Sequence, residues 1–349
     1  MIAGVHAQGN AVEVTVRLTI VGCPAADRIR QDVRDAALRA GAARADVALE
    51  VMSAEEREAL TRRLRGGRRA VQFGPGTLTR VIAVTSGKGG VGKSSLTANL
   101  AVALAQQGLA TGVLDADVHG FSIPGLLGLV DGAGRAVRPT RIDDLIVPPI
   151  AHGVKAISIG MFLRDGDENA AVAWRGPMLH RTVRQFLTDV HFGDLDVLLL
   201  DMPPGTGDVA ISVGQLLPSA EVLVVTTPQT PAAGIAVRSG RVARQLGQRL
   251  LGVVENMAPL QLPDGTLLDL FGSGGGDDVA RALTTADEPV PLLASVPLSP
   301  ALRSSGDAGV PLVIRDPGDP AARAISGLAT TIAATGRNLA GRALPMRPV

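Results

Sequence analysis

The chain contains one cysteine, no tyrosine and one tryptophan in 349 residues. A disulfide needs two thiols, so Cys23 excludes one within the chain and fits a reducing cytoplasm. A single thiol also excludes a four-cysteine metal site built by one chain. Aromatic residues make up 2% of the sequence, which disfavours binding of nucleic acid by base stacking.

Strong charge and long apolar runs are also lacking. The net charge is +1, so no strong field attracts nucleic acid or an anionic membrane. No apolar run approaches the roughly 20 residues of a membrane span. Residues 1–10 lack the basic and apolar regions of a signal peptide. We therefore expect a cytoplasmic protein with neither a membrane nor a nucleic-acid partner.

The most informative motif is a complete phosphate-binding P-loop at residues 87–94, GKGGVGKS. An apolar run at 81–84 predicts a strand before it, and a stripe of Leu and Ala from Leu96 to Leu104 predicts a helix after it. Backbone N–H groups of such a loop and the helix N-terminus bind phosphate. We expect Lys93 to reach the β- and γ-phosphates and Ser94 to bind Mg²⁺. The predicted nucleotide-binding residues of this segment are Gly87, Lys88, Gly89, Gly90, Val91, Gly92, Lys93, Ser94 and Ser95.

Acidic residues end two predicted strands downstream. Asp115 and Asp117 share one side of an extended segment, where one can join the Mg²⁺ shell and the other can orient a water towards the γ-phosphate. We assign Asp115 to the metal and Asp117 to catalysis. Asp201 follows four apolar residues and is expected to contact Mg²⁺ through water. The alternative is that the Asp115 and Asp117 pair only forms a turn at a strand end.

The chain is organised in two parts. Residues 1–65 combine an alternating strand at 11–20, a helix from Pro24 to Gly41, a strand at 47–51 and a helix at 55–64. Residues 66–79 are an expected linker. Seven apolar runs then alternate with helical stretches over 80–336, which predicts a doubly wound, mostly parallel sheet of the P-loop NTPase type. Residues 337–349 are predicted to form a loose tail.

The motifs together resemble the Mrp/ApbC family of iron–sulfur cluster carrier ATPases, in the deviant Walker A group with ParA and MinD. The small N-terminal part, with LTIVGCP at 18–24, resembles the iron–sulfur-assembly domain often fused to these ATPases. It begins late by comparison, so the expectation is either a truncated domain or a misassigned start. The matching segments include SGKGGVGKS (86–94), LDADVHGFSIPGLLG (114–128), WRGPM (174–178), LLLDMPPGTGDVAIS (198–212), VVTTPQ (224–229), ENM (255–257), FGSGGG (271–276) and SVPLSPALRSSGDAGVPLV (295–313).

This resemblance implies an ATP-hydrolysing homodimer that delivers iron–sulfur clusters to apoproteins or assembly factors. It implies that Lys88 reaches across the dimer to the partner's nucleotide and is catalytic together with Lys93 and Asp117. It also implies that Asn256 contacts the adenine. The alternatives are that Lys88 is a solvent-facing loop lysine and that Asn256 is a turn residue at a strand end.

The sequence departs from the family at the cluster ligands. In the family, E-N-M is followed by C-P-x-C, whereas Leu262 and Gly265 stand at the two cysteine positions here. Neither residue can ligate iron. Cys23 is the remaining candidate for a cluster or sulfur residue, at a predicted helix N-terminus that favours a thiolate. Its alternative role is that of a small buried residue. The alternative function is a ParA- or MinD-like dimeric nucleotide switch that carries no cluster.

Overall fold

The computed structural model describes residues 2–19, 26–53, 55–57, 59–60, 72–74, 77–117, 120–143, 145–163, 176–262 and 264–335. Cys23, Trp174, most of the predicted linker and the predicted tail at 337–349 lie outside this set. Residue contacts divide the chain into two compact units. The first contains residues 1–70, 138–148 and 189–193, and the second contains residues 71–137, 149–188 and 194–349.

The first unit is built on a three-stranded sheet in the order β1-β2-β3, with β1 antiparallel and β3 parallel to β2. Its elements are β1 (Ile2–Gln8), β2 (Ala11–Leu18), α1 (Ala26–Arg39) and β3 (Arg44–Val51). The alternation predicted for 11–20 places Val14, Val16 and Leu18 in a small core, against which Ile29 and Val33 of α1 pack. This unit is the predicted α+β fold, with β1 added at its edge.

A hairpin inside the predicted ATPase segment belongs by its contacts to the first unit. Its antiparallel strands are β6 (Thr140–Ile142) and β7 (Leu145–Val147). The side chains of Ile142, Leu145 and Ile146 are buried. The hydroxyl of Thr19 donates to the carbonyl oxygen of Arg141 at 3.4 Å. The first unit therefore combines the N-terminal segment at residues 1–70 with a hairpin from residues 138–148.

The second unit contains an eight-stranded sheet in the order β15-β12-β11-β4-β10-β5-β9-β8. All neighbouring pairs are parallel except β8 and β9. β4 lies in the middle because β10 and β11 pair on its two sides, which confirms the predicted doubly wound, mostly parallel α/β fold. The strands are β4 (Arg80–Ser86), β5 (Thr111–Asp115), β8 (Ile150–Ala151), β9 (Val154–Ser158), β10 (Val197–Asp201), β11 (Glu221–Thr226), β12 (Arg249–Ala258) and β15 (Leu292–Pro297).

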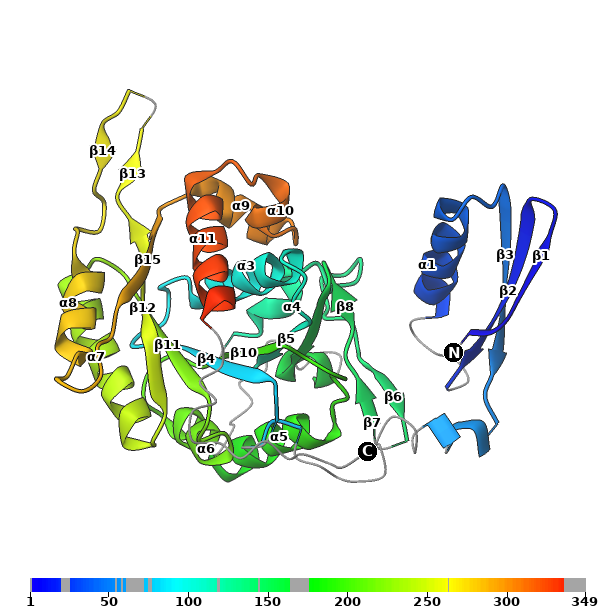
Figure 1. Ribbon diagram of the computed structural model, residues 1–349, viewed down its shortest axis with the longest axis horizontal. Helices are drawn as coiled ribbons and strands as arrows, with labels where there is room; N and C mark the ends of the chain where they lie inside the picture. Colours follow the sequence, from blue (N-terminus) through cyan, green and yellow to red (C-terminus); the bar gives the residue numbers. More distant parts are fainter. Residues whose placement is uncertain are drawn as a thin grey trace. The chain divides into compact units, whose positions relative to one another are not determined.

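Helices cover both faces of this sheet (Figure 1). α3 and α11 pack together on one face, and α6, α7 and α8 lie on the other. A small antiparallel hairpin of β13 and β14 projects beyond the end of β12. The remaining elements are α3 (Lys93–Gln106), α4 (Ser122–Leu126), η1 (Ile159–Phe162), α5 (Gly176–Asp189), α6 (Asp208–Leu216), α7 (Thr230–Gln245), β13 (Leu260–Gln261), β14 (Leu267–Leu268), α8 (Gly275–Leu283), α9 (Pro300–Asp307), α10 (Leu312–Arg315) and α11 (Pro320–Ala334).

The helix after the P-loop is buried on more sides than its predicted stripe requires. Every residue of α3 from Leu96 to Leu104 is buried, including Thr97 and Asn99. The reason is that α3 lies between the sheet and α11, whose Ile325, Leu328 and Ile332 are also buried. A helix that is apolar on all sides is typical of such a position. The site-bearing helix is therefore fixed from both sides.

A buried arginine joins the two ends of the second unit. Arg80 begins β4, pairs with Glu221 at the start of β11, and is 8% exposed. Its Nη1 donates to the carbonyl oxygens of Ile332 and Thr335, at 2.5 and 2.7 Å. A cation at the C-terminus of α11 satisfies carbonyl groups that have no partner within the helix. The last helix is thus attached to the central strand of the sheet.

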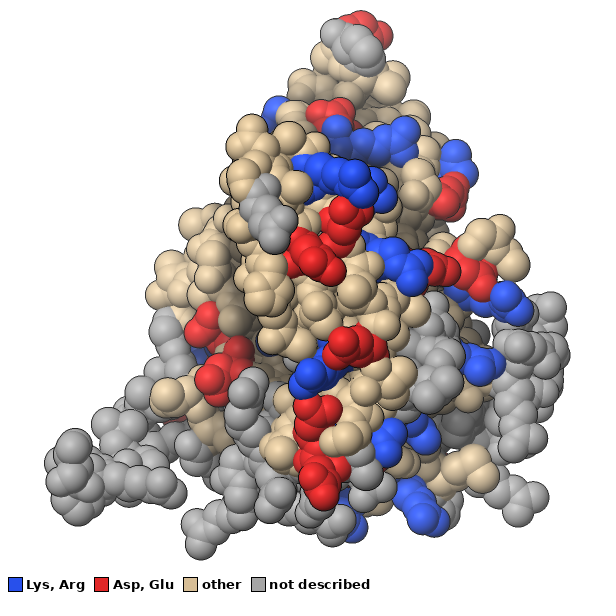
Figure 2. Space-filling view, turned by 90° about the vertical axis from the view of Figure 1, so that its right-hand side faces the viewer, with Lys and Arg blue, Asp and Glu red and all other residues tan. Residues whose placement is uncertain are grey.

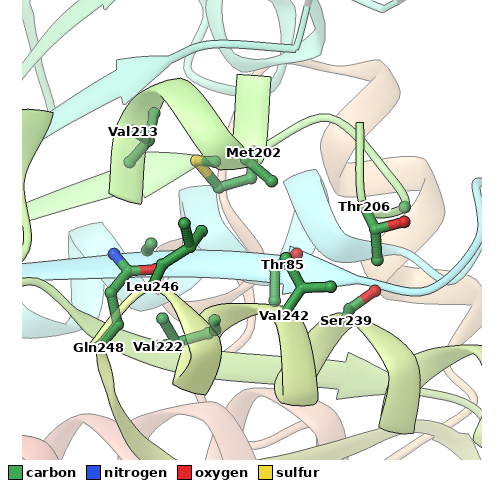
Figure 3. A pocket seen from close by; sticks show the side chains of 13 residues that line it. Thr85, Met202, Thr206, Val213, Val222, Ser239, Val242, Leu246 and Gln248 are labelled. Carbon is green, nitrogen blue, oxygen red and sulfur yellow. The ribbon is translucent and has the colours of Figure 1, made fainter. Parts of the chain in front are cut away.

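A cavity of about 20 Å³ lies between α6, α7 and the sheet (Figure 3). Met202, Val213 and Leu246 contribute apolar walls, and Thr206 and Ser239 contribute hydroxyl groups. The Ser239 side chain is 4% exposed, and among the described residues its hydroxyl has no hydrogen-bond partner. A buried hydroxyl without a partner retains an uncompensated desolvation penalty.

We expect Ser239→Ala to stabilise the protein. The substitution removes the unpaired hydroxyl and is expected to raise the free energy of unfolding by about 1 kcal/mol, the low end for an unsatisfied buried group. Urea unfolding measures this change. The control is Ser304→Ala, since the Ser304 hydroxyl donates to the Ala301 carbonyl at 3.2 Å and its removal should lower stability. A loss of stability in Ser239→Ala as large as that in the control would contradict the prediction.

Candidate nucleotide-binding site

The predicted P-loop connects β4 to α3 at the carboxyl edge of the sheet. Gly90 and Gly92 both have φ of 77°, a left-handed conformation that favours glycine. Gly92 is the N-cap residue of α3 and has no side-chain cap, so the first N–H groups of the helix remain available. Gly87 is needed for another reason, because a Cβ there would lie 2.4 Å from the backbone nitrogen of Ala236. The glycines therefore serve both loop shape and packing.

The loop encloses a cleft of about 400 Å³. Backbone groups of the P-loop form one wall, and Asp117 and Pro204 contribute from two neighbouring strand ends. This size and location suit a phosphate-bearing ligand at the carboxyl ends of parallel strands. The cleft is lined by Ser86, Lys88, Gly89, Gly90, Val91, Gly92, Lys93, Ser94, Ser95, Asp117, Gly120, Ser122, Leu126 and Pro204.

Lys93 is the central cation of the site. Its ammonium nitrogen lies 2.8 Å from Asp201 Oδ1 and 3.6 Å from Asp117 Oδ2. The Lys93 side chain is 6% exposed. A buried lysine is tolerated because carboxylates compensate its charge. The predicted catalytic residues Lys93 and Asp117 are thus brought together, with Asp201 beside them.

Asp201 accepts hydrogen bonds from three groups on the first turn of α3. Ser94 Oγ donates to Oδ2 at 2.6 Å, and Thr97 Oγ1 donates to Oδ1 at 3.0 Å, beside the Lys93 contact. Burial raises the pKa of Asp201, while the Lys93 charge and the hydrogen bonds act in the opposite direction. Thr97 was not anticipated from the sequence; its position three residues after Ser94 on a helix is the signal that places both hydroxyls on one face.

Asp115 stands directly opposite Asp201 on the neighbouring strand β5. Its carboxyl is fully buried, accepting hydrogen bonds from Ser158 Oγ at 2.9 Å and from the Asp117 backbone at 3.1 Å. Burial raises the pKa of Asp115 well above its ordinary value, and the nearby charge of Asp201 raises it further. Asp115 therefore lies behind Asp117 and does not line the cleft.

We expect Asp115→Asn to stabilise the protein increasingly as pH rises. The folded chain keeps the Asp115 proton at pH values where the unfolded chain has lost it. The contribution of Asp115 to the free energy of unfolding is fully present below the ordinary pKa of 3.8. It is lost as pH rises through the raised pKa of the folded state. Asparagine is neutral throughout, so its advantage should grow over that range and then level off.

Urea unfolding at several pH values between about 4 and 8 checks this prediction. The control is Asp131→Asn on an exposed loop, because the backbone N–H of Arg135 lowers the pKa of Asp131. That substitution should reduce stability by an amount that stays constant over this pH range, because the whole range lies above the ordinary pKa of 3.8, where the contribution of a group with a lowered pKa is complete. The same trend with pH in both variants would contradict the assignment of Asp115.

Lys88, the earlier of the two lysines in the loop, contacts a different partner. Its ammonium donates to Gln229 Oε1 at 2.8 Å, and its side chain is half-buried at the cleft. Its carbonyl oxygen accepts from Ser86 Oγ at 3.0 Å, which orders the backbone there. Gln229 does not line the cleft, and sequence analysis missed its contact with Lys88 because that contact joins residues 141 positions apart.

The segment after β10 is attached to the strand that leads into the P-loop. Met202 N donates to the Val84 carbonyl at 3.1 Å, and Gly205 N donates to the Ser86 carbonyl at 2.8 Å. Gly205 has φ of 88°, which a residue with a side chain rarely adopts. The loop at 202–207 is thus coupled to the phosphate site through two backbone hydrogen bonds.

Asn256 contacts the P-loop from behind. Its amide nitrogen donates to the Val91 carbonyl at 2.8 Å, and its side chain is 3% exposed. A Cβ on Gly92 would lie 2.2 Å from the same amide nitrogen. Asn256 therefore supports the loop backbone and is not among the residues that line the cleft. The predicted adenine contact stays a prediction.

The positions that differ from the family's cysteines lie on the β13–β14 hairpin. Leu262 N donates to the Thr266 carbonyl at 2.8 Å, and Gly265 N donates to the Leu262 carbonyl at 2.9 Å. Leu267 and Leu270 on this hairpin are 66% and 58% exposed. Within the described residues no group of three or more His, Cys, Asp or Glu is arranged to hold a metal ion.

The donor set beside the phosphate cleft fits Mg²⁺. Ser94 offers a hydroxyl oxygen and Asp201 a carboxylate, and hard oxygen donors are the ligands that Mg²⁺ prefers. One or two protein oxygens suffice, because Mg²⁺ usually keeps waters and shares phosphate oxygens with a bound nucleotide. The fit therefore agrees with the small number of acidic groups at the site.

The fold and the site together define a P-loop nucleotide-binding protein. A nucleotide-binding protein from Archaeoglobus fulgidus, solved in complex with ADP, is 36% identical, with a TM-score of 0.55 over 66% of this chain and 86% of that one. The septum site-determining protein MinD from Pyrococcus horikoshii shares the fold at 24% identity, with a TM-score of 0.53 over 75% of this chain and 98% of that one.

The family follows from two sequence models. Residues 77–333 match the model described as NUBPL iron-transfer P-loop NTPase, and residues 1–51 match the model described as iron-sulfur cluster assembly protein. An iron-sulfur cluster carrier protein of Mycobacterium tuberculosis is 52% identical over 344 residues, covering 97% of this chain and 88% of that protein. The chain belongs to the NUBPL-type, Mrp/ApbC family of P-loop NTPases, which confirms the resemblance.

Proposed function

We propose that this protein is a cytoplasmic, ATP-hydrolysing iron–sulfur cluster carrier that acts as a homodimer on apoproteins or assembly factors. The observation that carries the proposal is the array of Lys93, Ser94 and Asp201 beneath an open P-loop cleft. The proposal that the cargo is an iron–sulfur cluster is supported by relatives named iron-sulfur cluster carrier protein. Among the described residues, no helix is both long and apolar enough to span the bilayer.

Each residue of the array has a role towards ATP. The P-loop N–H groups and Lys93 bind the β- and γ-phosphates, and Ser94 and Asp201 hold Mg²⁺. Bound Mg²⁺ supplies positive charge to the phosphate oxygens. Lys93 exchanges its contact with Asp201 for phosphate oxygens as the nucleotide enters. Asn256 keeps the loop in shape through the Val91 carbonyl.

Asp117 orients the attacking water. It lines the cleft, whereas Asp115 is sealed behind it. Its backbone N–H donates to Asp115, which fixes the segment that presents its carboxylate to the cleft. A carboxylate in such a position accepts a hydrogen bond from water near the γ-phosphate. Lys88 completes the site from a second protomer.

Protein clients are favoured over nucleic acid by the charge distribution. Figure 2 shows basic and acidic side chains interspersed on one face of the molecule. Exposed ion pairs such as Arg281 with Asp278 and Arg303 with Asp307 compensate charge locally on the second unit. A nucleic-acid partner requires a concentrated basic surface.

Cargo binding is expected to be weak. Leu262 and Gly265 remove the family's ligands, and Cys23 is the only thiol of the chain. Two Cys23 side chains in a dimer provide two ligands where an ordinary cluster uses four. Thiols of a client or of a small molecule supply the others, so the cluster is readily passed on.

Anaerobic reconstitution tests the proposal, with iron and sulfide counted per dimer for the wild type and for Cys23→Ser. We expect a labile cluster in the wild type and none in the variant, with ATP hydrolysis the same in both. A stable cluster in Cys23→Ser without added thiol would contradict the ligand assignment. No cluster in either protein, with hydrolysis intact, would favour the dimeric nucleotide switch that the missing cysteines at 262 and 265 suggest.

A further inference from the structure

The sequence is unusually poor in lysine. Of its 34 basic residues, Lys88, Lys93 and Lys155 are the only lysines, and two of them are in the P-loop. The charge of Lys93 is compensated by Asp201 and Asp117. Within the described part of the chain, Lys88 has no carboxylate within ion-pair distance, and its ammonium is bound by the neutral amide of Gln229.

Gln229 is well placed to control where this ammonium points. It is the N-cap residue of α7, and its carbonyl accepts from Ala232 N and Ala233 N. The same helix is in close backbone contact with the P-loop at Gly87, where no Cβ fits beside Ala236. The distance between Gln229 and the loop is therefore fixed by packing, and the amide reaches Lys88 from a rigid position.

We propose that Gln229 is a positioning residue that holds Lys88 back in the nucleotide-free chain and releases it when a phosphate is offered by a second protomer. This inference rests on the proposed function of Lys88 in a dimer. A neutral acceptor leaves the lysine charge available for an anion. A carboxylate at the same place would add ion pairing to the hydrogen bond from the ammonium and would hold Lys88 more strongly.

Because the chain has only three lysines, the restraint of Lys88 by Gln229 can be measured directly through the reactivity of the Lys88 amine. Acetylation of amines in nucleotide-free protein, followed by mass spectrometry, reports Lys88 separately, with Lys155 as the internal reference. The Gln229 amide occupies the Lys88 ammonium and restrains it at the edge of the cleft, which hinders its approach to the reagent. We expect the Lys88 rate to rise about threefold or more in Gln229→Ala, the size expected for one hydrogen bond, and to fall in Gln229→Glu.

Activity gives the second readout. Gln229→Glu should reduce ATP turnover and ATP-dependent dimerisation by at least about tenfold, while Gln229→Ala should equal or exceed the wild type. The double variant Lys88→Ala/Gln229→Glu should turn over ATP no more slowly than Lys88→Ala alone, because coupled residues are not additive. The controls are Gln245→Ala and Gln245→Glu, at the exposed C-terminal end of the same helix.

The outcomes separate this inference from the proposed function. An unchanged Lys88 acetylation rate in Gln229→Ala would overturn the hold, whether or not the protein hydrolyses ATP. Equal losses of turnover in Gln229→Ala and Gln229→Glu would contradict the proposal that Gln229 must release Lys88 for catalysis. Gln229 would then hold Lys88 in its active position. If the wild type neither hydrolyses ATP nor dimerises, the proposed function fails, while the acetylation rates still decide the hold. Unchanged melting temperatures confirm that each variant is folded.

Discussion

Lys93→Ala is expected to abolish ATP hydrolysis and to destabilise the protein. The substitution removes the cation that lies 2.8 Å from Asp201 and 3.6 Å from Asp117. Breaking a buried ion pair costs about 3–5 kcal/mol because an uncompensated charge remains. It also removes a charge-assisted phosphate contact of about 1.5–3 kcal/mol. Steady-state phosphate release and urea unfolding measure the two effects.

Two further variants separate catalysis from folding at this position. Lys93→Ala/Asp201→Asn removes both charges and should recover part of the lost stability without recovering hydrolysis. Lys155→Ala, at the only lysine outside the P-loop, should leave turnover unchanged. Wild-type turnover in Lys93→Ala would refute the catalytic assignment.

Asp117→Asn is expected to bind ATP normally and to hydrolyse it slowly. Asparagine keeps the size of the side chain and removes the charge that orients water. A loss of at least about 10²-fold in kcat is the low end for a positioned proton-handling group. The nucleotide Kd should change little, since the P-loop and Lys93 remain. A fluorescent ATP analogue measures the affinity, and single-turnover hydrolysis measures the chemical step.

The matched control is Asp277→Asn, an exposed aspartate in the first turn of α8. It should hydrolyse ATP at the wild-type rate. If Asp117→Asn instead loses affinity and turnover to the same degree, Asp117 acts in Mg²⁺ binding or folding. Asp115, whose carboxyl accepts a hydrogen bond from the Asp117 backbone, would then be the residue that orders the backbone of this segment.

The sequence predicted the sheet and the phosphate site because their signals are local. The P-loop spacing identifies Lys93 and Ser94 within eight residues, and the apolar runs before Asp115 and Asp201 identify two strand ends. Parallel strands then bring these ends to one edge of the sheet. The contacts of Lys93 and Ser94 with Asp201 follow from that arrangement.

The residues that sequence analysis missed act across long separations. Ser158 reaches Asp115 from the end of β9, and Gln229 reaches Lys88 from the start of α7. Ser158 stands in no motif, and the family-like segment VVTTPQ (224–229) contains Gln229 without indicating its contact with Lys88. The support of Val91 by Asn256 was missed for the same reason, since it depends on how closely β12 approaches the loop.

Short or weakly apolar strands were missed as well. β1 contains Gly4 and His6 and has a register shift, so it lacks the alternation that revealed β2. The β13–β14 hairpin has two residues in each strand and exposes its leucines. Periodicity cannot detect strands of that length. These elements lie at edges, and their absence from the prediction leaves the phosphate site unaffected.

Because β4 lies in the middle of the sheet, it cannot pair with its neighbouring strands until much later parts of the chain have been synthesised. On the ribosome β4 emerges early, but its neighbours β10 and β11 begin at Val197 and Glu221, more than a hundred residues later. The hydrogen bonds of Arg80 with the carbonyls of Ile332 and Thr335 can form only later still, after the end of α11 has been synthesised. At roughly 5–20 residues per second, the P-loop strand stays unpaired for on the order of ten seconds. The newborn chain therefore exposes Val81, Ile82 and Val84, which are buried in the folded sheet, throughout that interval.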